Sequence, residues 1–110
     1  MRTIYHLVTR SVWEEKPDRP YRAESLASEG FIHCSFAEQV ARSANRFHAD
    51  AAELLLLHID AERLSSPLRE EASGAGEIFP HIHGPLNRDA VAAVEVLARG
   101  PDGRWRFSRS

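Results

Sequence analysis

The sequence predicts an α+β fold, with about six short strands in one small mixed or antiparallel sheet and two or three helices. Short runs of apolar and β-branched residues recur along the chain, separated by turn signals rich in Gly, Pro, Asn and Asp. Only segment 35–47 has the spacing of a longer amphipathic helix. The 110 residues suit one domain, 1–110, with one modest core.

The N-terminal part of the chain predicts one strand and two short helices. Thr3–Val8 is rich in β-branched and aromatic residues, which favours a strand. Segment 11–14 has the Ser-x-x-Glu pattern of a capping box, so a short helix is predicted to begin near Ser11. Ser25 is predicted to cap another helical turn, and Gly30 is placed to end it.

The middle of the chain predicts a helix between two buried strands. Phe31–Cys34 is expected to form a short strand, after which Ser35 caps a helix through a second Ser-x-x-Glu pattern. Leu54–Ile59 is a continuous apolar run, as expected for a central strand buried on both faces. The apolar stripe of the helix is Phe36, Val40, Ala44 and Phe47.

The second half of the chain predicts further extended segments. Pro80 places its own segment at the edge of the sheet, because proline has no N–H for a strand on one side. A Pro-Asp-Gly turn at 101–103 predicts a terminal hairpin. The extended segments are Leu68–Ala72, Glu77–Ile82 and Arg104–Phe107. Ala90–Ala98 could be helix or strand, and the alternation of Val94, Val96 and Ala98 favours a strand.

Composition excludes several classes of function. The net charge of −2 gives no electrostatic footprint for general binding of nucleic acid or membranes, so neither partner is expected. The single Cys34 excludes an internal disulfide and is consistent with a reducing, cytoplasmic location. No apolar stretch approaches the ~20 residues of a membrane-spanning helix. The sequence sets no oligomeric state.

Two separated polar clusters predict one ligand site. His33 and Ser35 lie where a strand meets a helix start, whose free N–H groups favour an anion. His81 and His83 share one face of an extended segment. We predict one pocket lined by these four residues, with Glu71 at its edge. The alternative is that Ser35 only caps the helix and the histidines are structural.

The predicted site contains no metal, and the histidines hydrogen-bond a polar ligand instead. Two histidines at this spacing can nevertheless bind a metal ion if the fold supplies a third ligand. The candidates for that ligand are His6, His33 and Glu71. Cys34 is interpreted as a small core residue rather than a nucleophile.

The motifs Glu29–Ser35 (EGFIHCS) and Phe79–Leu86 (FPHIHGPL), together with Ile4–Leu7 (IYHL), resemble the bacterial family called domain of unknown function 952. The resemblance runs from about Ile4 to Val96. That family has a fold similar to the ADP-ribosyltransferases, including the RNA 2′-phosphotransferase type. The resemblance implies an NAD-binding cleft in which His6 holds a ribose and Glu71 completes the site.

The resulting hypothesis is a small enzyme-like domain, of the transferase class, that binds NAD or another phosphorylated nucleotide. The alternative is a non-catalytic ligand-binding or interaction module with the same fold. It is favoured by Leu7-Val8, which stand where the transferases have Gly-Thr. The predicted catalytic residues are His33, Glu71 and His81, and the predicted ligand-binding residues are His6, Ser35, Gln39 and His83.

Overall fold

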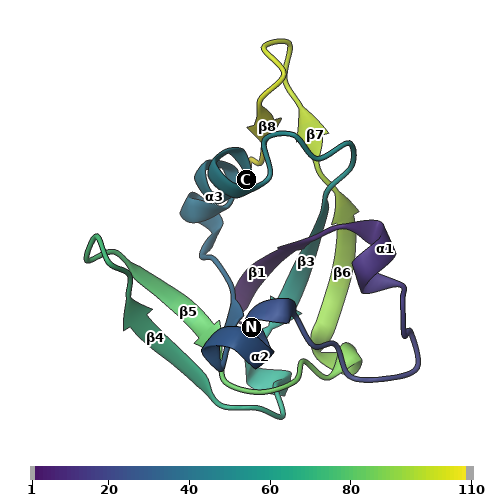
Figure 1. Ribbon diagram of the computed structural model, residues 1–110, viewed down its shortest axis with the longest axis vertical. Helices are drawn as coiled ribbons and strands as arrows, with labels where there is room; N and C mark the ends of the chain where they lie inside the picture. The colour runs from purple at the N-terminus through teal and green to yellow at the C-terminus, as the bar shows by residue number, and fades with distance from the viewer. Residues whose placement is uncertain (1, 109–110) are drawn as a thin grey trace.

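The computed structural model describes residues 2–108, which form two three-stranded antiparallel sheets and one two-stranded hairpin (Figure 1). The α-helices are α1 (Arg10–Trp13), α2 (Glu24–Glu29) and α3 (Val40–Phe47), and short 3-10 helices lie at Ala37–Gln39, Ala61–Arg63 and Arg88–Ala90. No helix within residues 2–108 is long and apolar enough to cross a membrane. The strands are β1 (Thr3–Val8), β2 (Ile32–His33), β3 (Leu55–Asp60), β4 (Leu68–Ala72), β5 (Ile78–Ile82), β6 (Val91–Val96), β7 (Ala98–Arg99) and β8 (Trp105–Arg106).

The first sheet has the order β1-β3-β6 and is organised around β3. The predicted central strand is confirmed, since Leu54–Leu57 are all at most 1% exposed. Leu55, Leu57 and Ile59 pack into one apolar cluster, whereas Leu54 and Leu56 pack into a second cluster with residues of α3. An apolar run without alternation is therefore explained by two covered faces.

The second sheet has the order β2-β5-β4, so β5 lies in its middle. The predicted edge position of this segment is wrong. Pro80 accepts a hydrogen bond from the Cys34 N–H at 3.1 Å, so its missing N–H also faces β2. The pairing of β2 with β5 covers only Ile32 and His33. It ends next to Pro80, which has no N–H to donate to β2.

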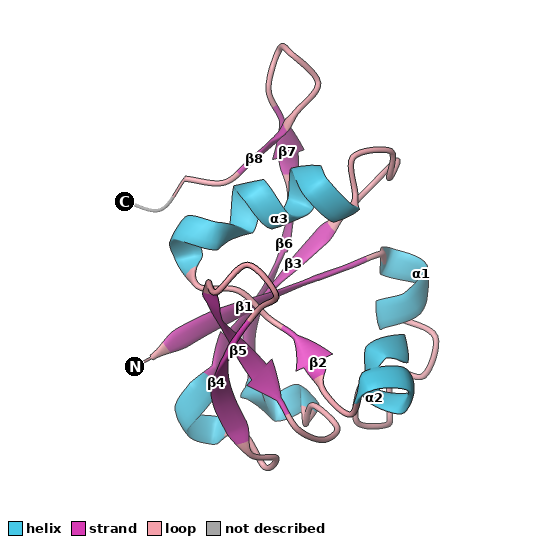
Figure 2. Ribbon diagram, turned by 60° about the vertical axis from the view of Figure 1, so that its left-hand side comes forward, coloured by secondary structure: helices cyan, strands magenta, loops and turns pink. Residues whose placement is uncertain are grey.

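One pair of backbone hydrogen bonds joins the two sheets. The Tyr5 N–H donates to the Ser35 carbonyl at 2.9 Å, and the Ser35 N–H donates to the Tyr5 carbonyl at 2.7 Å. The predicted single sheet is thus divided, with β4 and β5 standing as a curved hairpin apart from β1, β3 and β6 (Figures 1 and 2). Residues of both sheets, including Ile4, Ile32 and Ile82, form the main core cluster.

Ser35 does not cap the following helix, which corrects the sequence prediction. Its backbone is engaged by Tyr5, so the chain stays extended and the helical turn begins at Ala37. Gln39 supplies half of a capping box, because its Oε1 accepts the Phe36 N–H at 2.9 Å. α3 buries Val40 and Ala44, whereas Phe47 is 68% exposed and does not continue the predicted stripe.

The two N-terminal helices also begin without the predicted serine caps. α1 follows Thr9 and α2 follows Ala23, and neither has a side-chain cap. The Ser25 hydroxyl instead donates to the Phe31 carbonyl at 2.7 Å. Gly30 does end α2, as predicted, with a left-handed φ of 90° that favours glycine.

Candidate functional site

The outer face of the second sheet carries an unusual set of side chains. Side chains directly opposite each other in an antiparallel pair share a face, and His81 is opposite both His33 on β2 and Arg69 on β4. Glu71 and Phe79 form the neighbouring pair on this side. With Phe31 and His83, which contact His81, these residues define what we call the histidine face: Phe31, His33, Arg69, Glu71, Phe79, His81 and His83.

One carboxylate oxygen lies at the centre of this face. Oε1 of Glu71 accepts hydrogen bonds from His81 Nδ1 at 2.8 Å and from His83 Nε2 at 2.7 Å. The bonds from His83 and His81 hold the pKa of Glu71 below its usual range, so the carboxylate is charged at neutral pH. A charged carboxylate can only accept, so both ring nitrogens carry their protons.

Phe31 packs against the three histidine rings of the cluster. Its ring stacks on His81 with a centroid distance of 4.0 Å and an interplanar angle of 13°. The His81 side chain is only 9% exposed, compared with 55% for His33. His33 lies beside His81, with ring centroids 5.4 Å apart, and its Nε2 is held by Glu29 at 3.0 Å.

Arg69 adds an unpaired positive charge to the face. It is exposed and directly opposite His81, and it makes no ion pair or side-chain hydrogen bond with any residue from 2 to 108. Arg69 is the only arginine in β4, since the preceding one, Arg63, lies in the 3-10 helix Ala61–Arg63. A free guanidinium beside imidazoles is well suited to an anion.

His6 is a buried structural neighbour of the face rather than part of it. Its Nδ1 donates to the His33 carbonyl at 2.6 Å, and its Nε2 accepts from the Tyr21 hydroxyl at 2.9 Å. Burial lowers the pKa of His6 to about 4, which keeps the ring neutral. With 7% exposure and both nitrogens engaged, His6 supports β2 from inside the fold.

The predicted anion site at Ser35 is wrong, because the Ser35 N–H is used by the Tyr5 carbonyl. Gln39 lies at the far end of β5, where its Nε2 donates to Glu77 at 3.0 Å and to the Ile78 carbonyl at 2.8 Å. Cys34 is buried in the core, and burial raises the pKa of its thiol. The structure therefore brings together His33, His81, His83 and Glu71, but neither Ser35 nor Gln39.

Three members of the histidine face, Phe31, Arg69 and Phe79, were not among the predicted site residues. Phe79 precedes His81 by two residues, a spacing that places both on one side of the strand. Phe31 was assigned only to a strand, although its spacing of two from His33 places both on one side. Arg69 has the same parity as Glu71 along β4, so it could have been selected with Glu71.

Gly84, which directly follows His83, packs closely against Ser66. A Cβ at residue 84 would lie 2.4 Å from the Ser66 Oγ, and the φ of 155° is one that side chains rarely adopt. We expect Gly84→Ala to lower the free energy of unfolding by about 1–3 kcal/mol. Gly74→Ala is the matched control, because a Cβ there meets nothing within 4 Å. Equal stability of both variants in urea denaturation would contradict this role.

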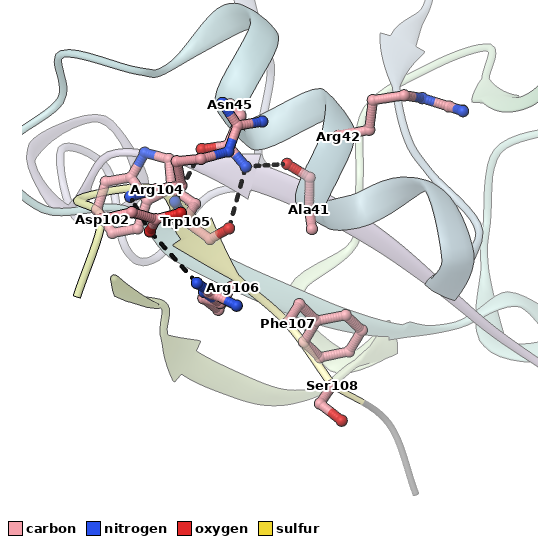
Figure 3. A pocket seen from close by; sticks show the side chains of 9 residues that line it. All are labelled: Ala41, Arg42, Asn45, Asp102, Arg104, Trp105, Arg106, Phe107 and Ser108. Carbon is pink, nitrogen blue, oxygen red and sulfur yellow. Dashed lines mark hydrogen bonds and ion pairs between the residues drawn. The ribbon is translucent and has the colours of Figure 1, made fainter. Parts of the chain in front are cut away.

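Two cavities lie away from the histidine face. The larger, of about 520 Å³, lies between α3 and the β7–β8 hairpin (Figure 3). Its wall includes Asn45, whose amide donates to the Ala41 and Trp105 carbonyls, and Arg42, which pairs with Glu77. The second, of about 360 Å³, adjoins Tyr21, and Arg88 there is bound to backbone carbonyls. Among residues 2–108, neither cavity wall holds a group of three His, Cys, Asp or Glu side chains close enough to share a metal ion.

Comparison with known proteins places the chain in a family. The chain is similar to protein CC0527 of Caulobacter crescentus: its crystal structure is 32% identical, with 96% of this chain and 94% of that chain covered at a TM-score of 0.85. Its solution NMR structure is 33% identical, with 94% and 91% covered at a TM-score of 0.79. A search among curated proteins found no match. The family described as "Protein of unknown function (DUF952)" matches residues 7–94. Because that match spans most of the chain and the similarity to CC0527 spans nearly all of it, the chain belongs to the DUF952 family.

Proposed function

We propose that the histidine face binds a phosphorylated ligand with a planar ring, of the nucleotide class that includes NAD. The observation that carries this proposal is the hydrogen bond of 2.8 Å between Glu71 and His81. The His81 imidazole is largely buried and lies directly opposite two exposed polar residues, His33 and Arg69. The ADP-ribosyltransferase-like fold implied by the family resemblance is part of the same proposal.

Glu71 and His81 have the arrangement of an oriented acid–base pair. The carboxylate fixes the proton of His81 on Nδ1, which leaves Nε2 as a proton acceptor. A general base of this kind would accept a proton from a hydroxyl or water that attacks the ligand. Transfer of ADP-ribose from NAD is one such reaction.

The residues around His81 suit the two parts of a nucleotide. Arg69 and His33 flank His81 across the sheet and can bind phosphate oxygens. Phe31 and Phe79 offer aromatic surface for a base or nicotinamide ring.

Binding is tested by calorimetric titration of NAD, ADP-ribose, AMP and inorganic phosphate in buffer that contains a chelator. We expect Arg69→Gln to weaken the binding of the phosphorylated ligands by about tenfold, because one charge-assisted contact is lost. Arg104→Gln is the matched control, since this exposed arginine lines the larger cavity instead.

Weaker binding in Arg104→Gln with unchanged binding in Arg69→Gln would move the ligand to the larger cavity. Absence of binding of all four compounds at millimolar concentration would contradict the nucleotide proposal. Binding without any turnover of NAD would instead favour the non-catalytic module.

A further inference from the structure

Glu71, His81 and His83 have the composition of a metal site. Their three donor atoms, one from each side chain, lie within 4.8 Å of one another. Among residues 2–108 no other group of three His, Cys, Asp or Glu side chains is arranged in this way. We propose that these three residues bind one divalent transition-metal ion of the Zn²⁺ class. This proposal differs from the sequence prediction, which has no metal in the site.

The hydrogen-bonded geometry is close to a coordination geometry. Tetrahedral Zn²⁺ with bonds of about 2.0–2.1 Å holds neighbouring donor atoms about 3.3 Å apart. The Glu71 oxygen lies 2.8 Å from His81 Nδ1 and 2.7 Å from His83 Nε2. These two separations need to widen by about half an ångström for an ion to replace the two protons. The two ring nitrogens, which lie within 4.8 Å of each other, need to come to the same spacing.

The charge balance also favours a cation. The Glu71 carboxylate is negatively charged, and an imidazole that binds a metal through one ring nitrogen can carry its proton on the other. Metal binding to the neutral rings thus needs no net loss of protons. Nitrogen donors favour Zn²⁺, Co²⁺ or Ni²⁺ over Mg²⁺ or Ca²⁺, which prefer oxygen.

The fold holds the three ligands in place before any ion arrives. Glu71 and His81 come from paired strands in fixed register, and Phe31 stacks on the His81 ring. His83 follows β5 directly, and its N–H donates to the Pro67 carbonyl at 2.8 Å. Ligands on rigid strands lose little freedom on binding metal.

Three protein ligands leave the fourth tetrahedral position for water or a substrate oxygen. His33 is not a fourth ligand in this arrangement, since its Nε2 is bound to Glu29 at 3.0 Å. A Zn²⁺-class ion with an open position can polarise a phosphoryl or carbonyl oxygen. In the metal-bound form His81 Nδ1 is a ligand, so the proton-transfer role proposed above belongs to the metal-free protein.

The test uses the untagged chain in chelator-stripped buffer, with no nucleotide or phosphate present. Co²⁺ is titrated while visible absorption is followed, and ZnCl₂ is titrated by calorimetry. We expect one equivalent of each ion, with the intense visible bands of four-coordinate Co²⁺. Glu71→Gln and His83→Gln are each expected to weaken Zn²⁺ binding by about 100-fold or more, because each removes a ligand or its charge.

The matched control is Glu95→Gln. Glu95 accepts a hydrogen bond from His58 Nε2 at 2.8 Å, so it forms the same kind of pair without a second histidine. This variant is expected to bind Zn²⁺ as the unchanged chain does. Equal Zn²⁺ affinity of Glu71→Gln, His83→Gln and the unchanged chain would overturn the proposal, as would the absence of a one-to-one complex at 100 µM Co²⁺ or Zn²⁺.

A measurement on the unchanged chain avoids any dependence on variants that fold poorly. Addition of Zn²⁺ should shift the NMR signals of the His81 and His83 rings and leave those of His58 in place. Shifts at His58 or at other surface histidines instead would contradict the site. Because no nucleotide is present here and a chelator is present in the nucleotide titration, the two proposals succeed or fail separately.

Discussion

Leu57→Ala is expected to lower the free energy of unfolding by about 3–4 kcal/mol, as large-to-small changes in well-packed cores do. Leu57 is fully buried in the middle of β3, where it packs into the cluster that joins the two sheets. Strands on both sides prevent the chain from collapsing into the cavity that the change creates. Guanidinium denaturation followed by circular dichroism measures the loss.

The control for this change is Val94→Ala. Val94 lies directly opposite Leu57 on β6 but is 46% exposed, so its loss should cost less than about 1 kcal/mol. A loss of similar size in both variants would show that position in the strand, rather than burial, sets the cost.

Acid is expected to destabilise the protein through His6. The ring titrates near 6.5 in the unfolded chain and at about 4 in the folded one, because burial disfavours its charged form. Between these values the unfolded chain binds a proton that the folded chain does not, so stability falls as the pH is lowered. The contribution of His6 is absent above pH 6.5 and reaches a penalty of about 3 kcal/mol at pH 4.

The measurement is the free energy of unfolding across pH 4 to 7.5, compared between the unchanged chain and His6→Gln. The variant should lose stability overall, because the His33 carbonyl and the Tyr21 hydroxyl lose their partner. Its stability should nevertheless depend less steeply on pH below 6.5. His58→Gln is the control, and a pH dependence flattened equally by both changes would refute the assignment to His6.

Local patterns predicted the strands better than the helix starts, for a physical reason. Two segments have apolar compositions that predict buried strands, and both form strands in the fold. They are Thr3–Val8 and Leu54–Ile59. Capping patterns describe only what a serine can do locally. At Ser35 the backbone is hydrogen-bonded to Tyr5, a residue far away in the sequence. No residue near Ser35 indicates that pairing.

The sequence predicts which residues of one strand share a face, because side chains alternate along it. It does not predict how two strands are aligned with each other. His81 and His83 are two residues apart on a strand, so a shared side follows from the pleat. That Glu71 rather than Glu70 faces them depends on the alignment of β4 with β5, which local sequence does not set. The same holds for the alignment of His33 with His81.

Pro80 has a consequence for the alignment of β2. A slip of two residues along β5 would set Ile32 opposite Pro80 instead of Ile82. The Ile32 carbonyl would then meet a ring nitrogen with no hydrogen, and one bond of a very short ladder would be lost. This strand of two residues is otherwise held by the backbone bonds between Tyr5 and Ser35 and by the bond from His6 to the His33 carbonyl. The proline therefore favours the alignment in which His33, rather than Phe31, lies opposite His81.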